Sequence, residues 1–351
     1  MRRLIYLLLI VLILFISTLA LTFPAKSFYF SAPSNFPIFK KSQEYRLIFV
    51  GDTMLDRDVE GSVYANGAGD FRYPFFYIAD LTASADIAFA NLEGNISDKG
   101  ANQGSIYSFR MNPLAIEGLT YAGFDVLSLA NNHSLDWGRT ALSDTISRLN
   151  DAGIKTVGAG ENEEQANAPA VFELSDGTKI AYLAYTDLYP KSFEATPTSA
   201  GISHYSKDSA SKAIQKAKTE MSADLVVVSL HWGYEYETEP RQWQKDLAYS
   251  LIDSGADLII GHHPHVVQEV EQYNPPFPKG GAPKGQGISQ DDKHAGYIAY
   301  SLGNFIFDQF FSKETMASLA IEVTIKNKII SKVIEIPLQI TPTYQSSVKK
   351  L

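Results

Sequence analysis

The residues best suited to chemistry in this sequence follow short apolar runs that are typical of buried strands. Five such runs end in polar side chains: Asp52; Asn91 and Glu93; Asn131, Asn132 and His133; His231; and His262, His263 and His265. In open α/β sheets, sites form outside the carboxyl ends of the strands. If the five strands are parallel neighbours, two carboxylates and up to five imidazoles therefore converge in one pocket.

Such a cluster is unfavourable without a cation, because each charge shifts the pKa values of its neighbours. A pair of divalent ions resolves this conflict. The chain contains no cysteine, so any metal must be held by His, Asp, Glu and Asn. This ligand set favours Mn²⁺, Fe or Zn²⁺ over Ca²⁺ or Mg²⁺. Two ions about 3.5–4 Å apart activate water and offset charge on phosphoryl oxygens, so the pattern predicts hydrolysis of a phosphate ester.

Most of these motifs also have a structural explanation when each is taken alone. A Gly-Asp pair after a strand is commonly a turn, and Glu93 can cap a helix. An isolated His231 is commonly a hydrogen-bonded core residue, and Asn131–His133 can be a capping loop. The run from Gly261 to His265, Gly-His-His-Pro-His, is different, because packing does not explain three imidazoles within four residues.

The order of the motifs resembles the CapA family of capsule synthesis proteins, the poly-γ-glutamate branch of the calcineurin-like metallophosphoesterase superfamily. The matching motifs are Gly-Asp, Asn-x-Glu, Asn-Asn-His, His-Trp-Gly, Gly-His-His-Pro-His and the run from Tyr300 to Gln309. The resemblance covers roughly residues 45–310. It implies an α/β fold of the metallophosphoesterase type, a sandwich of β-sheets flanked by helices.

The resemblance also implies a role for each matching residue. The implied metal ligands are Asp52 and His265 for the first ion, Glu93 as the bridging carboxylate, and Asn132, His231 and His263 for the second ion. His133 corresponds to the histidine that assists the leaving group, so His133 and Asp52 are the implied catalytic residues. The implied substrate-binding residues are Asn131, His262 and Asn304. Whether His262 or His263 faces the metal stays open, although the His-Pro-His spacing favours His263.

The sequence departs from the superfamily pattern in two places. The Asp-x-His motif reads Asp52-Thr53-Met54 here, so a thioether stands where an imidazole belongs. The first ion is therefore expected to bind weakly, unless another residue such as Asp56 fills the position. The Gly-Asp-x-x-Asp-Arg motif is shortened to Asn91–Gly94.

Aromatic and acidic residues surround His231. Trp232, Tyr234 and Tyr236 are expected to pack in the core or at the rim of the site rather than to stack on a sugar. Glu235 and Glu237 are either partners that orient the imidazoles or solvated charges.

The apolar periodicity predicts one α/β domain over residues 45–340, followed by a tail at 341–351. The expected buried strands are Arg46–Val50, Ile87–Ala90, Val126–Ala130, Leu225–Leu230 and Leu258–Ile260. The expected helices are Pro113–Ala122, Thr140–Ala152, Lys207–Met221 and Arg241–Ser254. Two hairpins are expected, Val171–Leu174 with Lys179–Tyr185, and Leu319–Ile325 with Lys332–Pro337 at a sheet edge.

The N-terminus predicts one transmembrane helix over residues 1–23, joined to the domain by a linker at 24–44. Arg2 and Arg3 precede an apolar run from Leu4 to Phe23, which is long enough as a helix to span about 30 Å of hydrocarbon. The two arginines place the domain outside the cytoplasm. A cleaved signal peptide with its apolar core at Leu4–Ile16 is the alternative, although no A-x-A cleavage site follows.

Charge limits the partners. The net charge of −9 argues against binding of nucleic acid through the overall field, so an anionic substrate needs a local cationic site. The segment Gln272–Ala295 contains Lys279, Lys284 and Lys293, and is either part of such a site or an inconsequential insertion. The expected partners are a phosphoester or anionic polymer, the membrane and, from the resemblance, membrane-bound capsule synthase subunits.

Three functions of different classes follow. The first is an extracytoplasmic metal-dependent phosphoester hydrolase in capsule or poly-γ-glutamate biosynthesis. The second is a non-catalytic accessory subunit of a polymer synthase or export complex, which binds polyanion through the metal site. The third is an anchored scaffold whose site has decayed, and it is least favoured because every motif except the Asp-x-His histidine is present.

Overall fold

The computed structural model describes residues 43–275 and 295–349, which belong to one compact unit. The predicted membrane segment, most of the predicted linker and the three lysines at 279, 284 and 293 lie outside these residues. Within the described ranges, no helix is both long and apolar enough to cross a bilayer.

The first sheet runs in the order β18-β17-β16-β1-β2-β5-β6, and β15 pairs with the end of β1. β1, β2, β5 and β6 are parallel. On the other side of β1, β16 pairs antiparallel with β1, β17 with β16, and β18 with β17. The strands are β1 (Glu44–Thr53), β2 (Ile87–Leu92), β5 (Val126–Ser128), β6 (Lys155–Val157), β15 (Asn304–Ile306), β16 (Ala317–Lys326), β17 (Ile329–Ile340) and β18 (Ser346–Val348).

The second sheet runs in the order β13-β14-β12-β11-β9-β8. Its four central strands are parallel, and the two edge strands are antiparallel to their neighbours. The strands are β8 (Ala170–Glu173), β9 (Lys179–Thr186), β11 (Leu225–His231), β12 (Leu258–His262), β13 (Val270–Tyr273) and β14 (Gly296–Ala299). Two short pairs lie outside both sheets, β3 (Asn95–Ile96) with β4 (Arg110–Met111) and β7 (Ala159–Gly160) with β10 (Gly201–Ile202).

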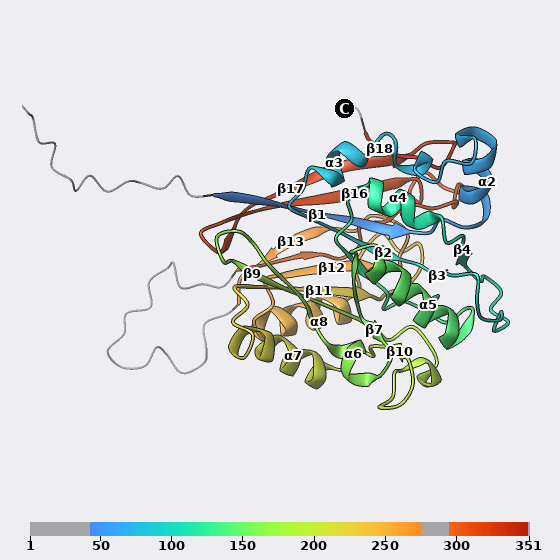
Figure 1. Ribbon diagram of the computed structural model, residues 1–351. Helices are drawn as coiled ribbons and strands as arrows, with labels where there is room; N and C mark the ends of the chain where they lie inside the picture. The colour runs from blue at the N-terminus through green and yellow to red at the C-terminus, as the bar shows by residue number, and fades with distance from the viewer. Residues whose placement is uncertain (1–42, 276–294, 350–351) are drawn as a thin grey trace, which may run out of the picture. The chain divides into compact units, whose positions relative to one another are not determined.

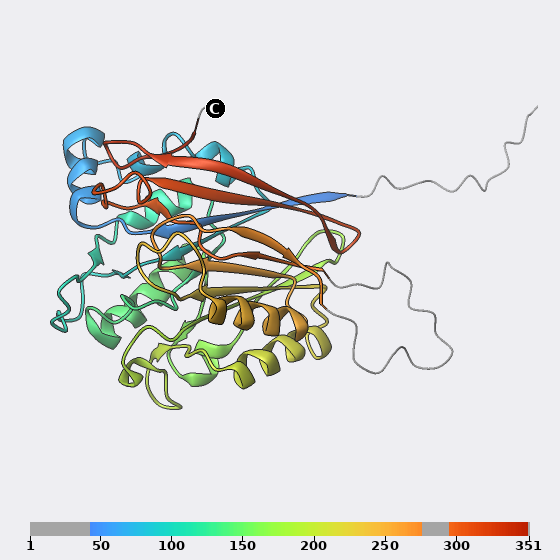
Figure 2. The ribbon, with the colours of Figure 1, turned by 180° about the vertical axis from the view of Figure 1, so that it is seen from behind.

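The two sheets stack face to face, and helices cover their outer faces (Figures 1 and 2). The helices are α2 (Arg57–Gly67), η1 (Tyr73–Phe75), α3 (Ala79–Ala83), α4 (Ala115–Tyr121), α5 (Gly138–Asp151), α6 (Glu163–Asn167), η2 (Lys191–Phe193), α7 (Lys207–Thr219) and α8 (Gln242–Asp253). Figure 1 shows α7 and α8 below the second sheet, and α2, α3 and α4 beside the first. The molecule is therefore an α/β sandwich flanked by helices.

Alternation along the strands builds the core on both faces of each sheet. Leu47 and Phe49 point into the layer between the sheets, whereas Ile48 and Val50 point toward the helices. Successive side chains of a strand face opposite ways, so a strand buried on both faces is apolar throughout. This burial explains the continuous apolar runs in the sequence.

Each of the five predicted strands and four predicted helices is present, with ends shifted by a few residues. Both predicted hairpins are also present. The five strands that precede the polar motifs do not form one set of neighbours, however, because three lie in the first sheet and two in the second. The segment after residue 340, predicted as a tail, contributes β18 to the edge of the first sheet beside the predicted C-terminal hairpin.

Candidate metal centre

The predicted site residues gather where the carboxyl ends of the two sheets meet. The register places Asp52 of β1 beside Asn91 of β2 in the first sheet. It places His231 of β11 beside His262 of β12 in the second. The loop after β5 reaches the same place, since Asn132 Oδ1 lies 2.8 Å from His231 Nε2. The site therefore joins two sheets, where the sequence suggested a single row of strands.

Two glycines permit the close approach of backbones at these strand ends. A Cβ on Gly51 would lie 1.9 Å from the carbonyl oxygen of Gly303, and a Cβ on Gly261 would lie 1.9 Å from that of Tyr300. Any side chain at either position would force the strands apart. The backbones can therefore pack this closely only with glycine directly before Asp52 and His262.

Asp52, Glu93 and His231 form a buried group whose ligand atoms all lie within 4.8 Å of one another. Asn91 holds this group together, because its Nδ2 donates to Asp52 Oδ1 at 2.9 Å and lies 3.4 Å from Glu93 Oε1. The sequence placed Asn91 among the converging side chains but gave it no role of its own.

Glu235, His263 and His265 form a second group with ligand atoms within 4.8 Å of one another. Both imidazoles are buried, whereas Glu235 is exposed. His263 and His265 have φ angles of 97° and 58°, in the left-handed region that side chains rarely adopt. Strained backbone of this kind clusters at functional sites.

The site has strongly shifted pKa values. Burial opposes the charge of Asp52, but the imidazoles of His262 and His265 outweigh burial and hold the pKa of Asp52 well below its usual value. Burial, and then the charge of Asp52, raises the pKa of Glu93 well above its usual value. Burial lowers the pKa of His231, and burial with the charge of His265 lowers that of His263 to about 3.

The pKa of His265 shifts in the opposite direction from those of His231 and His263. Burial alone would lower its pKa, but Glu93 and Asp52 raise it to about 9. The buried carboxylates and imidazoles of the site therefore shift one another's pKa values in opposite directions. A divalent ion bound among them would compete with protons for the same ligand atoms.

Unpartnered atoms show that these residues fit a metal. Glu93 Oε2, Nε2 of His262 and Nδ1 of His263 are buried and have no hydrogen-bond partner among the described residues. Buried polar atoms without partners are costly and rare. Carboxylate oxygens and imidazole nitrogens are common ligands of Mn²⁺, Fe and Zn²⁺. These ligand atoms, several of them without hydrogen-bond partners, thus suit divalent ions at this place.

His133 lies at the edge of this cluster. Its Nδ1 lies 2.8 Å from Asp136 Oδ2, and its ring packs 4.2 Å from that of Phe109, measured between centroids. Asp136 Oδ2 also accepts from the backbone N–H of Phe109 at 2.9 Å. Asp136 therefore fixes the ring and leaves Nε2 as the atom able to exchange a proton. The sequence prediction missed Asp136, although its position three residues after His133 is a common spacing for a contact.

The three predicted substrate-binding residues are all buried and face the protein. Asn131 Nδ2 donates to the carbonyl of Leu92 at 2.7 Å, and Asn131 Oδ1 accepts from the N–H of His133 at 3.1 Å. Asn304 Oδ1 lies 2.9 Å from His265 Nδ1, so Asn304 orients that imidazole. Both asparagines therefore have protein partners in this structure.

His262 and His263 differ in their surroundings. His262 is fully buried, and its Nδ1 lies 3.1 Å from Asp52 Oδ1. His263 belongs to the second group of potential ligands and packs 4.9 Å from the ring of His231, measured between centroids. The arrangement is consistent with His263 as the ligand of the pair.

Neither residue considered for the missing imidazole faces the cluster. Met54 is fully buried in the apolar layer under the helices. Asp56 caps α2 through the N–H of Arg57 at 2.8 Å and also accepts from the N–H of Arg110 at 2.7 Å. Both carboxylate oxygens of Asp56 therefore accept hydrogen bonds from backbone N–H groups.

The aromatic residues after β11 have separate places. Trp232 is buried and stacks on Tyr300, with 5.9 Å between ring centroids. Tyr236 lies at the rim, where its ring centroid is 6.3 Å from that of His265. Core packing is thus confirmed for Trp232 and rim packing for Tyr236.

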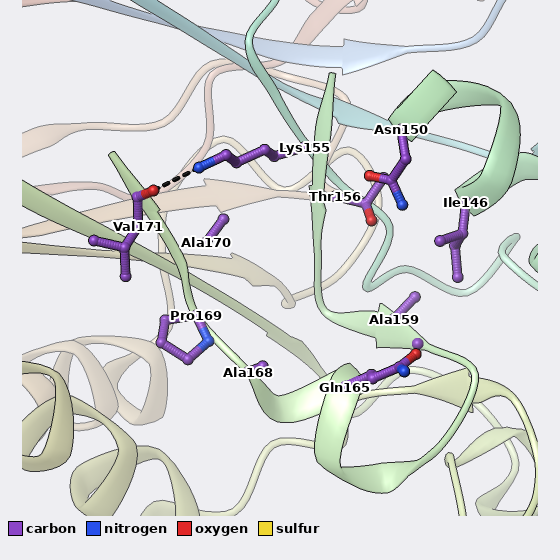
Figure 3. A pocket seen from close by; sticks show the side chains of 11 residues that line it. Ile146, Asn150, Lys155, Thr156, Ala159, Gln165, Ala168, Pro169, Ala170 and Val171 are labelled. Atoms are coloured by element: carbon purple, nitrogen blue, oxygen red, sulfur yellow. Dashed lines mark hydrogen bonds between the residues drawn. The ribbon is translucent and has the colours of Figure 1, made fainter. Parts of the chain in front are cut away.

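A separate cavity of about 320 Å³ lies between α5, β6, α6 and β8 (Figure 3). Its wall includes Asn150, Thr156 and Gln165, but no Asp, Glu or His. The ammonium group of Lys155 is bound to the carbonyl of Val171 at 2.6 Å. This cavity offers no metal ligands and contains none of the predicted site residues.

A family model described as bacterial capsule synthesis protein PGA_cap matches residues 46–309. The chain belongs to this family. It is 33% identical over 286 residues to the capsule biosynthesis protein CapA of Bacillus anthracis, a match that covers 80% of this chain and 64% of that relative. It is 31% identical over 304 residues to the PGA biosynthesis protein CapA of Bacillus subtilis (strain 168), covering 86% of this chain and 73% of the relative. The chain thus spans just under two thirds of the first of these capsule synthesis proteins.

Among solved structures, the chain resembles one described as a novel phosphatase of Mycoplasma pneumoniae. The TM-score is 0.47 and the identity 14%, with 86% of this chain and 96% of the other covered.

Proposed function

We propose that this member of the capsule synthesis family is a metal-dependent phosphoester hydrolase. The observation that carries the proposal is the convergence of carboxylates and imidazoles from both sheets, with buried unpartnered atoms at Glu93 and His263. Structural ion pairs satisfy their buried atoms. Buried carboxylate and imidazole atoms without a hydrogen-bond partner are instead suited to bind a cation.

The roles divide between the two groups of side chains. The residues that would hold metal are Asp52, Glu93, Asn132, His231, His263 and His265. When bound, a pair of divalent ions supplies a nucleophile from water at neutral pH and offsets charge on phosphoryl oxygens. His133, held by Asp136, carries a proton at Nε2 and gives it to the leaving oxygen of the ester.

The substrate that we propose is an anionic phosphoester of the cell envelope, used in making or attaching a capsule polymer. Two relatives have names that refer to capsule or PGA biosynthesis. We further propose that the N-terminal segment anchors the chain in the membrane with the domain outside, among membrane-bound synthase subunits. The support is the apolar run Leu4–Phe23 after two arginines.

The test is hydrolysis of a simple aryl phosphodiester by the purified full chain loaded with Mn²⁺, with bound metal measured by elemental analysis. We expect activity that disappears with chelator and returns with metal. His231→Ala should lose both tight metal binding and activity. A protein that is loaded with metal and folded but inactive on every phosphoester tried would contradict the hydrolase. Chelator-sensitive binding of poly-γ-glutamate by such a protein would then favour the accessory subunit.

A further inference from the structure

The loop after β11 carries a carboxylate to the metal centre that is not among the ligands predicted from the sequence. Glu235 lies in this loop, four residues after His231. Its carboxylate and the imidazoles of His263 and His265 have ligand atoms within 4.8 Å of one another. Two ligands of one ion are separated by at most roughly 4–4.4 Å, given metal–ligand distances of about 2.0–2.2 Å. The three side chains are thus near enough to share one ion after they move closer together.

Two hydrogen bonds fasten this loop to the segment that carries the histidines. The N–H of Tyr236 donates to the carbonyl of Pro264 at 2.8 Å, directly between His263 and His265. The side chain of Gln268 donates to the carbonyl of Glu237 at 2.7 Å. Tyr236 itself has a φ of 66°, so three residues around the group have left-handed backbone. The backbone directly after Glu235 is therefore fixed to the segment that carries His263 and His265.

An independent observation points to a ligand at this place. His263 Nδ1 is buried and has no hydrogen-bond partner within the described part of the chain. Glu237, two residues further along, contrasts with Glu235, because Arg241 Nε donates to its carboxylate at 2.8 Å. The charge of Glu237 is thus already balanced, whereas Glu235 has two imidazoles as neighbours.

We propose that Glu235 is a metal ligand that takes the place of the imidazole missing from the Asp-x-His motif. Met54 stands at the imidazole position and is buried in the apolar layer, so the chain needs a ligand from another element. A carboxylate suits a hard or borderline divalent ion far better than a thioether does. Glu235 also adds a negative charge to Asp52 and Glu93, which brings the ligand charge closer to that of two divalent ions. This inference rests on the proposed metal site and names a ligand that the motifs omit.

The test compares Glu235→Gln with Glu237→Gln, a matched control two residues away. Mn²⁺ binding to the full chain is measured by calorimetry and elemental analysis, and coupling between two ions by electron paramagnetic resonance. We expect two ions in the wild type and in Glu237→Gln. In Glu235→Gln, one ion should bind at least about 10-fold more weakly, and the signal of coupled ions should give way to that of an isolated ion. Glu235→Asp should recover part of the affinity.

The outcomes separate this inference from the proposed function. Two ions bound equally tightly by Glu235→Gln and the wild type would overturn the role of Glu235 and leave the metal centre intact. A wild type that binds no metal would overturn both. Because Glu235 is exposed, the substitution should not unfold the protein, and circular dichroism of each variant checks this.

Discussion

The buried polar side chains of the centre divide into those with protein partners and those without. Asn91, Asn131 and Asn304 have partners and hold the other residues in place. Glu93 and His263 have unpartnered atoms and face the position where we propose metal. Motifs in the sequence identified both kinds together, because they give residue types and order. They could not separate a ligand from its support, since this depends on which atoms meet across two sheets.

Asp136 allows a test of one support residue. Asp136→Asn would remove the carboxylate that holds the ring of His133 and that balances its positive charge when Nε2 also carries a proton. We expect turnover of a phosphodiester to fall about 10²–10⁴-fold, the range attributed to general acid catalysis. Metal content should stay at the wild-type level. Adding His133→Ala to Asp136→Asn should cause little further loss.

At the scale of the elements, strands were easier to predict than their arrangement. Runs such as Leu225–Leu230 and Ile87–Ala90 are apolar because both of their faces are buried. That pattern is the same in either sheet, so it could not show that β2 and β11 belong to different sheets. Pairing also depends on contacts far apart in sequence, such as β15 with the end of β1. Helix α2 was missed, since its buried apolar residues are only Val59 and Val63.

Helix α5 is tied to the segment after β3 by a partly buried charge network. Asp144 accepts from Ser97 at 2.7 Å, from Lys99 at 2.6 Å and from Arg148 at 2.7 Å. Burial opposes its charge, but these partners lower the pKa of Asp144 to about 2. Its contribution to stability is therefore complete above the unfolded pKa of 3.8 and is lost as the pH falls toward 2.

Asp144→Asn should lower the free energy of unfolding by about 1–3 kcal/mol near neutral pH, because it weakens hydrogen bonds to charged groups. Chemical denaturation measures this loss. The difference between variant and wild type should shrink between pH 4 and pH 2. Asp98→Asn is the control, since Asp98 is exposed and pairs only at the surface with Arg148, and it should cost at most about 1 kcal/mol. Equal losses in the two variants would contradict the role of Asp144.

At the scale of the whole molecule, the sequence predicts on which side of the membrane the domain lies. A reporter enzyme that is active only outside the cytoplasm, fused after Leu351, should be active, and a reporter active only in the cytoplasm should not. Replacing Arg2 and Arg3 with glutamate should reduce this bias, because positive residues keep the N-terminus inside. Activity of the cytoplasmic reporter in the unmodified chain would contradict the proposed topology.

The position of the centre between two sheets links metal binding to the stability of the whole domain. Asp52 and Glu93 come from the first sheet, and His231 and His263 come from strand ends of the second. An ion that binds only the folded state at 100 times its dissociation constant adds about 2.7 kcal/mol. For a domain of this size, each kcal/mol raises the melting temperature by about 2–4 °C.

Saturating Mn²⁺ should therefore raise the melting temperature by about 5–10 °C over protein in chelator, as measured by calorimetry. Because the pKa of Glu93 is raised, protons compete with the metal, and the increase should become smaller as the pH falls. Glu93→Gln should reduce the increase, since the amide cannot supply the charge that the ion needs. Asp98→Asn should keep it, because Asp98 lies on the surface. A melting temperature unaffected by either metal or chelator would mean that the two sheets are held together without the ions, and that the cluster of acids and imidazoles has another purpose.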